Sequence, residues 1–134
     1  MRRFAAASLA AALLAGCGTP AADLFEVTRT GRDRNANVRM LVGDGGTVKC
    51  NDAAPKAIDG PTLLEARQIA RDLAEHAELA IELPPGENAS LSYRVRTEAG
   101  SVAFSDRSEG RPKAFDRVVA FTARVSEDVC GLQR

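Results

Sequence analysis

The sequence is poor in aromatic residues. It has no tryptophan and one tyrosine, and aromatic residues make up 4% of the chain. Proteins that bind sugars or nucleobases stack these ligands on aromatic rings, so we do not expect a stacking platform. Histidine is scarce too, since His76 is the only one. No motif places a serine or cysteine nucleophile beside His76, and we therefore expect a surface histidine and no catalytic residue.

The apolar segment near the N-terminus, residues 4–14, is too short to span a membrane, which takes about twenty residues. Arg2 and Arg3 precede it and small residues follow it, which is typical of a signal peptide. Its end, Leu14-Ala15-Gly16-Cys17, resembles the lipobox of bacterial lipoproteins. The resemblance implies cleavage before Cys17, lipidation of Cys17 with a diacylglyceryl group and fatty acyl chains such as palmitate, and a location on the extracytoplasmic face of the cell membrane. The alternative is an ordinary secretory signal in which Cys17 has no role.

Three parts are expected on this basis: a lipoprotein signal peptide over residues 1–16, a lipidated tether over 17–23 and a single α+β domain over 24–134. The full chain has 18 basic and 18 acidic side chains. Removal of residues 1–16 takes away two arginines, and the small negative charge that remains argues against nucleic acid as a partner.

The two cysteines that remain after Cys17 are Cys50 and Cys130. Exported proteins meet an oxidising environment, so we expect these two residues to form a disulfide. It closes a loop of about eighty residues, for which the chain-entropy argument gives roughly 4.5 kcal/mol. A redox-active pair is the alternative, but the chain has no Cys-x-x-Cys motif.

Alternation of apolar and polar residues predicts the strands, and helical spacing of apolar residues predicts the helices. The expected strands are residues 24–30, 38–42, 47–50, 91–96 and 102–104, and the apolar helix faces lie within 63–77 and 115–129. We therefore expect an α+β fold in which an antiparallel sheet of about five strands carries two helices on one face.

Capping residues mark the expected ends of both helices. Thr62 with Glu65 fits a capping box for the first helix, and a start with Gly60 as cap and Pro61 at the first helical position fits nearly as well. Pro112 is expected to open the second helix and Gly131 to end it.

The sheet face away from the helices is expected to carry polar side chains towards water. These are Glu26, Thr28, Arg39, Lys49, Arg94 and Arg96. Arg94 and Arg96, joined by Arg29, form a candidate basic patch for an acidic partner, and plain solubilising charges are the alternative. No metal site or cofactor is expected: Asp33-x-Asn35-x-Asn37 is similar to the start of a calcium loop, but Val38 stands where that loop needs glycine.

Three short motifs resemble the emfourin family of small metalloprotease inhibitors. They are Phe25-x-Val27-x-Arg29-x-Gly31, Tyr93-x-Val95 and Pro112 before an apolar helix. The resemblance implies a compact α+β protein without a catalytic centre, and it favours a binding module over an enzyme. This chain lacks a second glycine after Gly31 and has a disulfide pair and a long polar loop before Val38, so no inhibitory residue is carried over.

The sequence thus favours a membrane-anchored extracytoplasmic lipoprotein that binds a protein or envelope component without catalysis. One alternative is an emfourin-like inhibitor of a secreted protease that acts through residues 30–37 or 83–88. The other is a structural accessory subunit of an envelope complex. Apart from the membrane itself, an extracellular protein is the expected partner, and no nucleic acid or small-molecule cofactor is expected.

Overall fold

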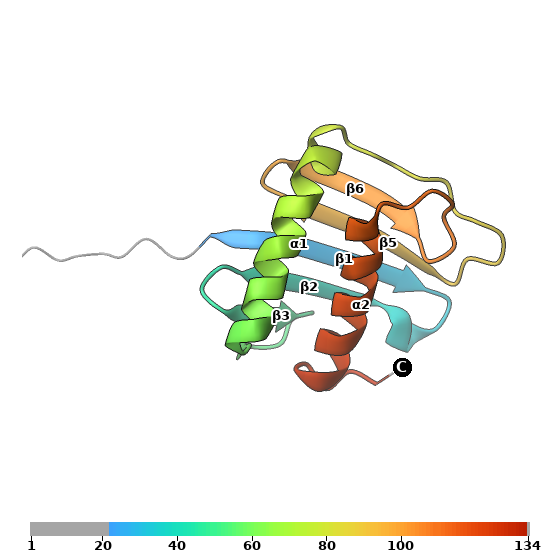
Figure 1. The fold of residues 1–134 in the computed structure, drawn as a ribbon. Helices are drawn as coiled ribbons and strands as arrows, with labels where there is room; N and C mark the ends of the chain where they lie inside the picture. The colour runs from blue at the N-terminus through green and yellow to red at the C-terminus, as the bar shows by residue number, and fades with distance from the viewer. Residues whose placement is uncertain (1–21, 134) are drawn as a thin grey trace, which may run out of the picture.

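Six strands form one antiparallel sheet in the order β4-β3-β2-β1-β5-β6 in the computed structural model, which describes residues 22–133. Helices α1 and α2 lie across the same face of this sheet (Figure 1). The strands are β1 (Asp23–Gly31), β2 (Val38–Gly43), β3 (Thr47–Cys50), β4 (Lys56–Ala57), β5 (Leu91–Thr97) and β6 (Gly100–Ser105), and the helices are α1 (Gly60–Glu78), α2 (Lys113–Asp128) and the short 3₁₀ helix η1 (Arg34–Ala36). The predicted α+β class with two helices on one face is confirmed.

The sheet has one strand more than the five expected. Strand β4 has two residues, Lys56 and Ala57, which pair with Val48 and Thr47 of β3. Two residues are too few to show alternation, so the sequence pattern assigned this segment to a loop.

Strand β1 lies at the centre and pairs with β2 on one side and β5 on the other. Phe25 and Val27 point into the core, while Glu26 and Thr28, which alternate with them, point away from it. Every second residue of a strand faces the same side, so β1 fixes which face of the sheet is buried.

The core between sheet and helices is apolar and rich in contacts between rings. The Phe104 ring stacks on Tyr93 and on Phe115, with centroid distances of 5.2 and 4.6 Å. The Phe25 ring meets Phe121 edge to face at 5.7 Å. These contacts join strands β1, β5 and β6 to α2, and stacked or edge-to-face rings are the arrangements that aromatic quadrupoles favour.

The helices pack antiparallel, and each buries the predicted apolar stripe. Two ion pairs cross between them, from Arg117 to Asp72 and from Arg124 to Glu65. The buried stripes are Ala66, Ile69, Leu73 and Ala77 on α1, and Phe115, Val118, Phe121 and Val125 on α2. Among residues 22–133, neither helix combines the length and the hydropathy that crossing a bilayer requires.

Helix α1 is capped by Asp59, and both predicted caps were wrong. The Asp59 carboxylate accepts a hydrogen bond from the Thr62 amide at 2.9 Å, with Asp59 in extended backbone geometry. Thr62 is therefore the donor at the third helical position, and Gly60 and Pro61 already lie inside the helix. Aspartate is among the residues most favoured as a helix N-cap, so Asp59 could have been predicted as the cap from the sequence. The capping-box motif at Thr62 favoured a start three residues later.

We predict that Asp59→Ala destabilises the protein in a pH-dependent way. Hydrogen bonds from the Thr62 side chain and then from its amide hold the pKa of the Asp59 carboxyl below its ordinary value. The stabilisation that the ionised Asp59 carboxylate gives to the folded state is therefore fully present above the unfolded pKa of about 3.9. It is lost as the pH falls through the lower pKa of the folded state. Urea unfolding should give a lower midpoint for Asp59→Ala at pH 7, with a difference that narrows in acid. Asp59→Asn keeps a neutral acceptor and is the control, and a gap that stays constant with pH contradicts the assignment.

A disulfide joins Cys50 and Cys130 as predicted, with an S–S distance of 2.03 Å. It links the end of β3 to the residues that follow α2, across 80 positions of sequence. Gly131 has a φ of 67°, which glycine adopts readily, and the chain turns there after the helix. The bridge therefore fastens the C-terminal end of the helical layer to the sheet.

The double variant Cys50→Ala/Cys130→Ala should lose about 2–5 kcal/mol of unfolding free energy, because the unfolded chain is no longer constrained by the cross-link. Urea unfolding under non-reducing conditions measures the loss. The wild type with reduced thiols is the matched control and should unfold close to the variant. A variant with the wild-type midpoint would show that the bridge adds nothing to stability.

Candidate functional site

The sheet face opposite the helices carries no helix in the described part of the chain, and it displays the polar set that the sequence predicted. Arg39, Lys49, Arg94 and Arg96 are exposed, and Glu26 and Thr28 are half-buried between them. We call this surface the open face.

Glu26 lies near the centre of the open face and pairs with two arginines. Its carboxylate is 3.0 Å from Arg39 Nε and 3.2 Å from Arg96 Nη2. Its side chain is 13% exposed, whereas those of the arginines are 65% and 67% exposed. Ion pairs this open to water add little stability, so both guanidinium groups keep an accessible outer side.

Arg29 does not join Arg94 and Arg96, because it lies on the other face of the sheet. It is 2% exposed and lies on the side of β1 that the helices cover. Its Nε donates to the carbonyl oxygen of Ala36 at 2.7 Å, and its Nη1 has no hydrogen-bond partner among the described residues. The alternation that turns Phe25 and Val27 inward also turns Arg29 inward. The alternation along β1 could therefore have predicted that Arg29 is buried. Its positive charge favoured an exposed position instead.

Arg94 borders a hollow in the open face that sequence reasoning missed. The hollow has a volume of about 370 Å³. Thr28 is paired across strands with Arg94, and Thr30 with Ser92, so three hydroxyl side chains lie beside the arginine. The other residues that line the hollow are Leu83, Pro85, Tyr93, Ala103, Phe104 and Ser105.

Arg94 is only loosely held by a carboxylate. Its Nη2 lies 3.4 Å from Glu82 Oε1, and the two side chains are 57% and 65% exposed. An ion pair at this distance and exposure is weak.

The wall of the hollow at the β6 edge of the sheet is formed by residues 81–86, of which Leu83 and Pro85 line the hollow. The Leu83 amide donates to the Ala103 carbonyl at 2.8 Å, and the Ala103 amide donates to the Ile81 carbonyl at 3.0 Å. These bonds form a parallel bridge between Glu82 and Ala103. The free edge of β6 is thereby covered at Ala103, where it can no longer pair with another strand.

Two serines fasten the next part of this wall to the loop after β6. The Ser108 hydroxyl donates to the Pro84 carbonyl at 2.7 Å and accepts a hydrogen bond from the Ser105 amide at 2.8 Å. The two hydroxyl oxygens lie 3.1 Å apart. Gly86 also lies against this loop, since a Cβ there would come within 1.8 Å of the Arg107 carbonyl oxygen. The wall is therefore packed tightly against the loop.

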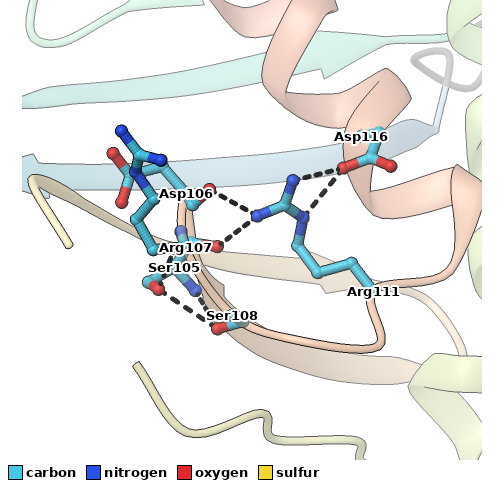
Figure 2. A network of polar contacts seen from close by, with 6 residues as sticks. All are labelled: Ser105, Asp106, Arg107, Ser108, Arg111 and Asp116. Carbon is cyan, nitrogen blue, oxygen red and sulfur yellow. Dashed lines mark hydrogen bonds and ion pairs between the residues drawn. The ribbon is translucent and has the colours of Figure 1, made fainter. Parts of the chain in front are cut away.

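Arg111 holds the same loop from its other side, as Figure 2 shows. Its Nη1 donates to the main-chain oxygens of Ser105 and Asp106, and the guanidinium pairs with Asp116 of α2 at 2.8 Å. The loop between β6 and α2 is thus fixed by side chains at both ends.

We predict that Ser108→Ala costs about 1–3 kcal/mol of unfolding free energy, because the buried Ser105 amide and the partly buried Pro84 carbonyl both lose a hydrogen-bond partner. Urea unfolding checks the loss. Ser101→Ala, on the outer side of β6, is the control and should stay within about 0.5 kcal/mol of the wild type. Equal midpoints for the two variants would show that the serine network does not hold the wall.

Of the two loops proposed for protease inhibition, residues 30–37 lie beside Ser90, while residues 83–88 lie along β6 and the loop that follows it. A Cβ on Gly31 would lie within 2.7 Å of the Ala36 Cβ and 3.0 Å of the Ser90 carbonyl, so residues 31–37 adjoin residue 90. Residues 31–37 and Ser90 lie at the Gly31 end of β1. The tether is expected to join the opposite end, at Asp23. The structure therefore places residues 31–37 beside Ser90, at the end of the sheet that includes Thr30 and Ser92.

His76 packs against an aromatic ring of the core, and the calcium-like segment forms a closed loop. His76 is half-buried on α1, and its ring meets Phe115 edge-on at 5.5 Å, so it packs instead of projecting into water. Asn37 Oδ1 accepts from the Gly31 amide at 3.0 Å, which closes the loop. Among the residues that the structure describes, no cluster of three or more His, Cys, Asp or Glu could hold a metal ion.

Cys17, the predicted lipid attachment site, lies outside the described residues. Comparison with protein families, curated proteins and solved structures gives no significant match to this chain.

Proposed function

We propose that this protein is a lipoprotein anchored through Cys17 on the extracytoplasmic side of the membrane, where its domain binds a protein partner without catalysing a reaction. The lipobox-like end of the signal sequence supports the anchor. The open face supports the binding role, because it is a large polar surface with accessible arginines and a hollow.

The position of the hollow along β1 is the observation that carries this proposal. Strand β1 has nine residues and is therefore about 30 Å long. The tether joins at its Asp23 end, and the hollow begins at Thr28 and reaches Thr30 near the other end. Five residue steps from Cys17 to Ala22 span at most about 18 Å. A lipid on Cys17 keeps the Asp23 end near the bilayer, so a partner approaching from the exterior can reach the hollow.

The chemistry of the hollow favours binding over catalysis. Its described lining consists of hydroxyl, guanidinium and apolar groups. Hydroxyls and a guanidinium hold an anionic or polar group by hydrogen bonds. A general base or an activated nucleophile would need an imidazole, carboxylate, amine or thiolate at the same place.

Cross-linking in intact cells tests the proposal. The full chain with an affinity tag is compared with Cys17→Ala, and the partners are identified by mass spectrometry. We expect wild-type protein to carry a lipid mass on Cys17 and to be cross-linked to one extracellular protein, with Cys17→Ala losing the lipid and, when supplied from outside, still binding that protein.

Several outcomes contradict the proposal. An unmodified Cys17 removes the anchor, and the absence of any specific partner removes the binding role. If the partner is a protease, inhibition of its activity by the purified protein would favour the inhibitor alternative over a neutral binding module. If it is a membrane protein that becomes unstable without this chain, the accessory-subunit alternative is favoured.

A further inference from the structure

We propose that the hollow beside Arg94 receives a carboxylate side chain from an acidic segment of the partner protein, and that this carboxylate replaces Glu82 on Arg94. The inference rests on the proposed function and specifies the chemistry of its partner. It is carried by the geometry around Arg94 and by the charges of the open face.

Arg94 is an available anion-binding group. Its contacts to Glu82 Oε1 measure 3.4 and 3.5 Å from its two terminal nitrogens, which is long for a charge-assisted hydrogen bond. One carboxylate oxygen is shared by both nitrogens, so the two-oxygen geometry that arginine and carboxylate prefer is not made. A carboxylate with better geometry can therefore displace Glu82 at little cost.

Hydroxyl groups lie where such a carboxylate would need further donors. Thr28 lies directly across from Arg94 on β1, and Ser92 lies two residues before Arg94 on the same side of β5. The described lining includes no acidic side chain, so a partner carboxylate meets no like charge within the hollow itself. A guanidinium flanked by hydroxyls is a suitable set of donors for a carboxylate.

The charges around the hollow favour an acidic polypeptide. Arg39, Lys49 and Arg96 share the open face with Arg94, and Glu26 is the acidic residue among them. Glu82 and Asp52 lie at opposite borders of this face, and Asp23 and Glu98 lie at the end of it near Arg96. On the strands of the face itself cationic groups therefore exceed carboxylates, and these cationic groups can attract and orient an acidic partner.

An anionic membrane is a poorer fit for this surface. Peripheral membrane binding combines basic residues with large apolar side chains that enter the lipid. The large exposed apolar residues of the described chain, Leu64 and Leu79, belong to α1 and its C-terminal cap, on the helical side of the sheet. The hollow is also concave, which suits a side chain better than a flat layer of headgroups.

The test uses a fluorescent peptide of ten residues in which glutamate alternates with serine, and a second peptide with glutamine in place of glutamate. Binding is measured by fluorescence anisotropy at low salt, with the exported chain carrying Cys17→Ala so that no lipid is attached. We expect the glutamate peptide to bind and the glutamine peptide to bind at least tenfold more weakly, because hydrogen bonds to charged groups are the stronger ones.

Three substitutions locate the site. Arg94→Gln should weaken binding of the glutamate peptide about tenfold. Glu82→Gln should strengthen it roughly two- to fivefold, because a weak internal competitor is removed. Arg71→Gln changes an exposed arginine on α1, whose Nη2 donates to Gln68, and should leave binding unchanged. Circular dichroism and urea unfolding confirm that each variant is folded.

The inference is overturned if the glutamine peptide binds equally well, if Arg94→Gln binds like the wild type, or if Glu82→Gln fails to strengthen binding. It is also overturned if vesicles containing phosphatidylserine bind and the glutamate peptide does not. A cellular partner that still cross-links to the Arg94→Gln protein would leave the proposed function standing while this inference fails. If Arg94→Gln loses both the cellular partner and the glutamate peptide, the result supports the proposed function and this inference together.

Discussion

Burial of a single face of the sheet is the constraint on which the rest of this structure depends. Two antiparallel helices cover the side that Phe25 and Val27 of β1 face. Glu26, Thr28 and Thr30 must then face the other side, since a shift of one residue would exchange the two sets. The hydrophobic effect selects the residues that face the core. Because the polar residues alternate with them along the strands, the same effect determines which side chains form the open face.

The hollow depends on contacts between parts of the chain that are distant in sequence. Its floor comes from β1, β5 and β6, and its wall from residues 81–86, which are held by main-chain bonds to Ala103 and by the Ser108 hydroxyl. Gly86 lets the wall approach the loop after β6 more closely than any other residue would allow. A wall fixed in this way is in place before a partner arrives, so little ordering entropy is lost on binding.

Local patterns predicted most of the fold. Alternation identified five of the strands and the outward set on the open face, and helical spacing identified both buried stripes. The disulfide followed from the cysteine count. Features that depend on few residues or on distant pairing escaped prediction: β4 has two residues, the bridge at Glu82 joins segments about twenty positions apart, and the hollow exists because β1 and β5 are neighbours. Arg29 differs from these features, because the alternation along β1 already placed it on the buried side. Only its charge favoured the exposed position that was predicted.

Site-specific photo-cross-linking in intact cells tests most directly whether the partner docks on the open face. A benzophenone side chain is placed at Ser92 on the open face, or at Glu75 on the exposed side of α1. The account predicts that Ser92 yields one cross-linked protein after irradiation and that Glu75 yields none. Cross-linking from Glu75 alone, or equally from both positions, would contradict the open face as the docking surface.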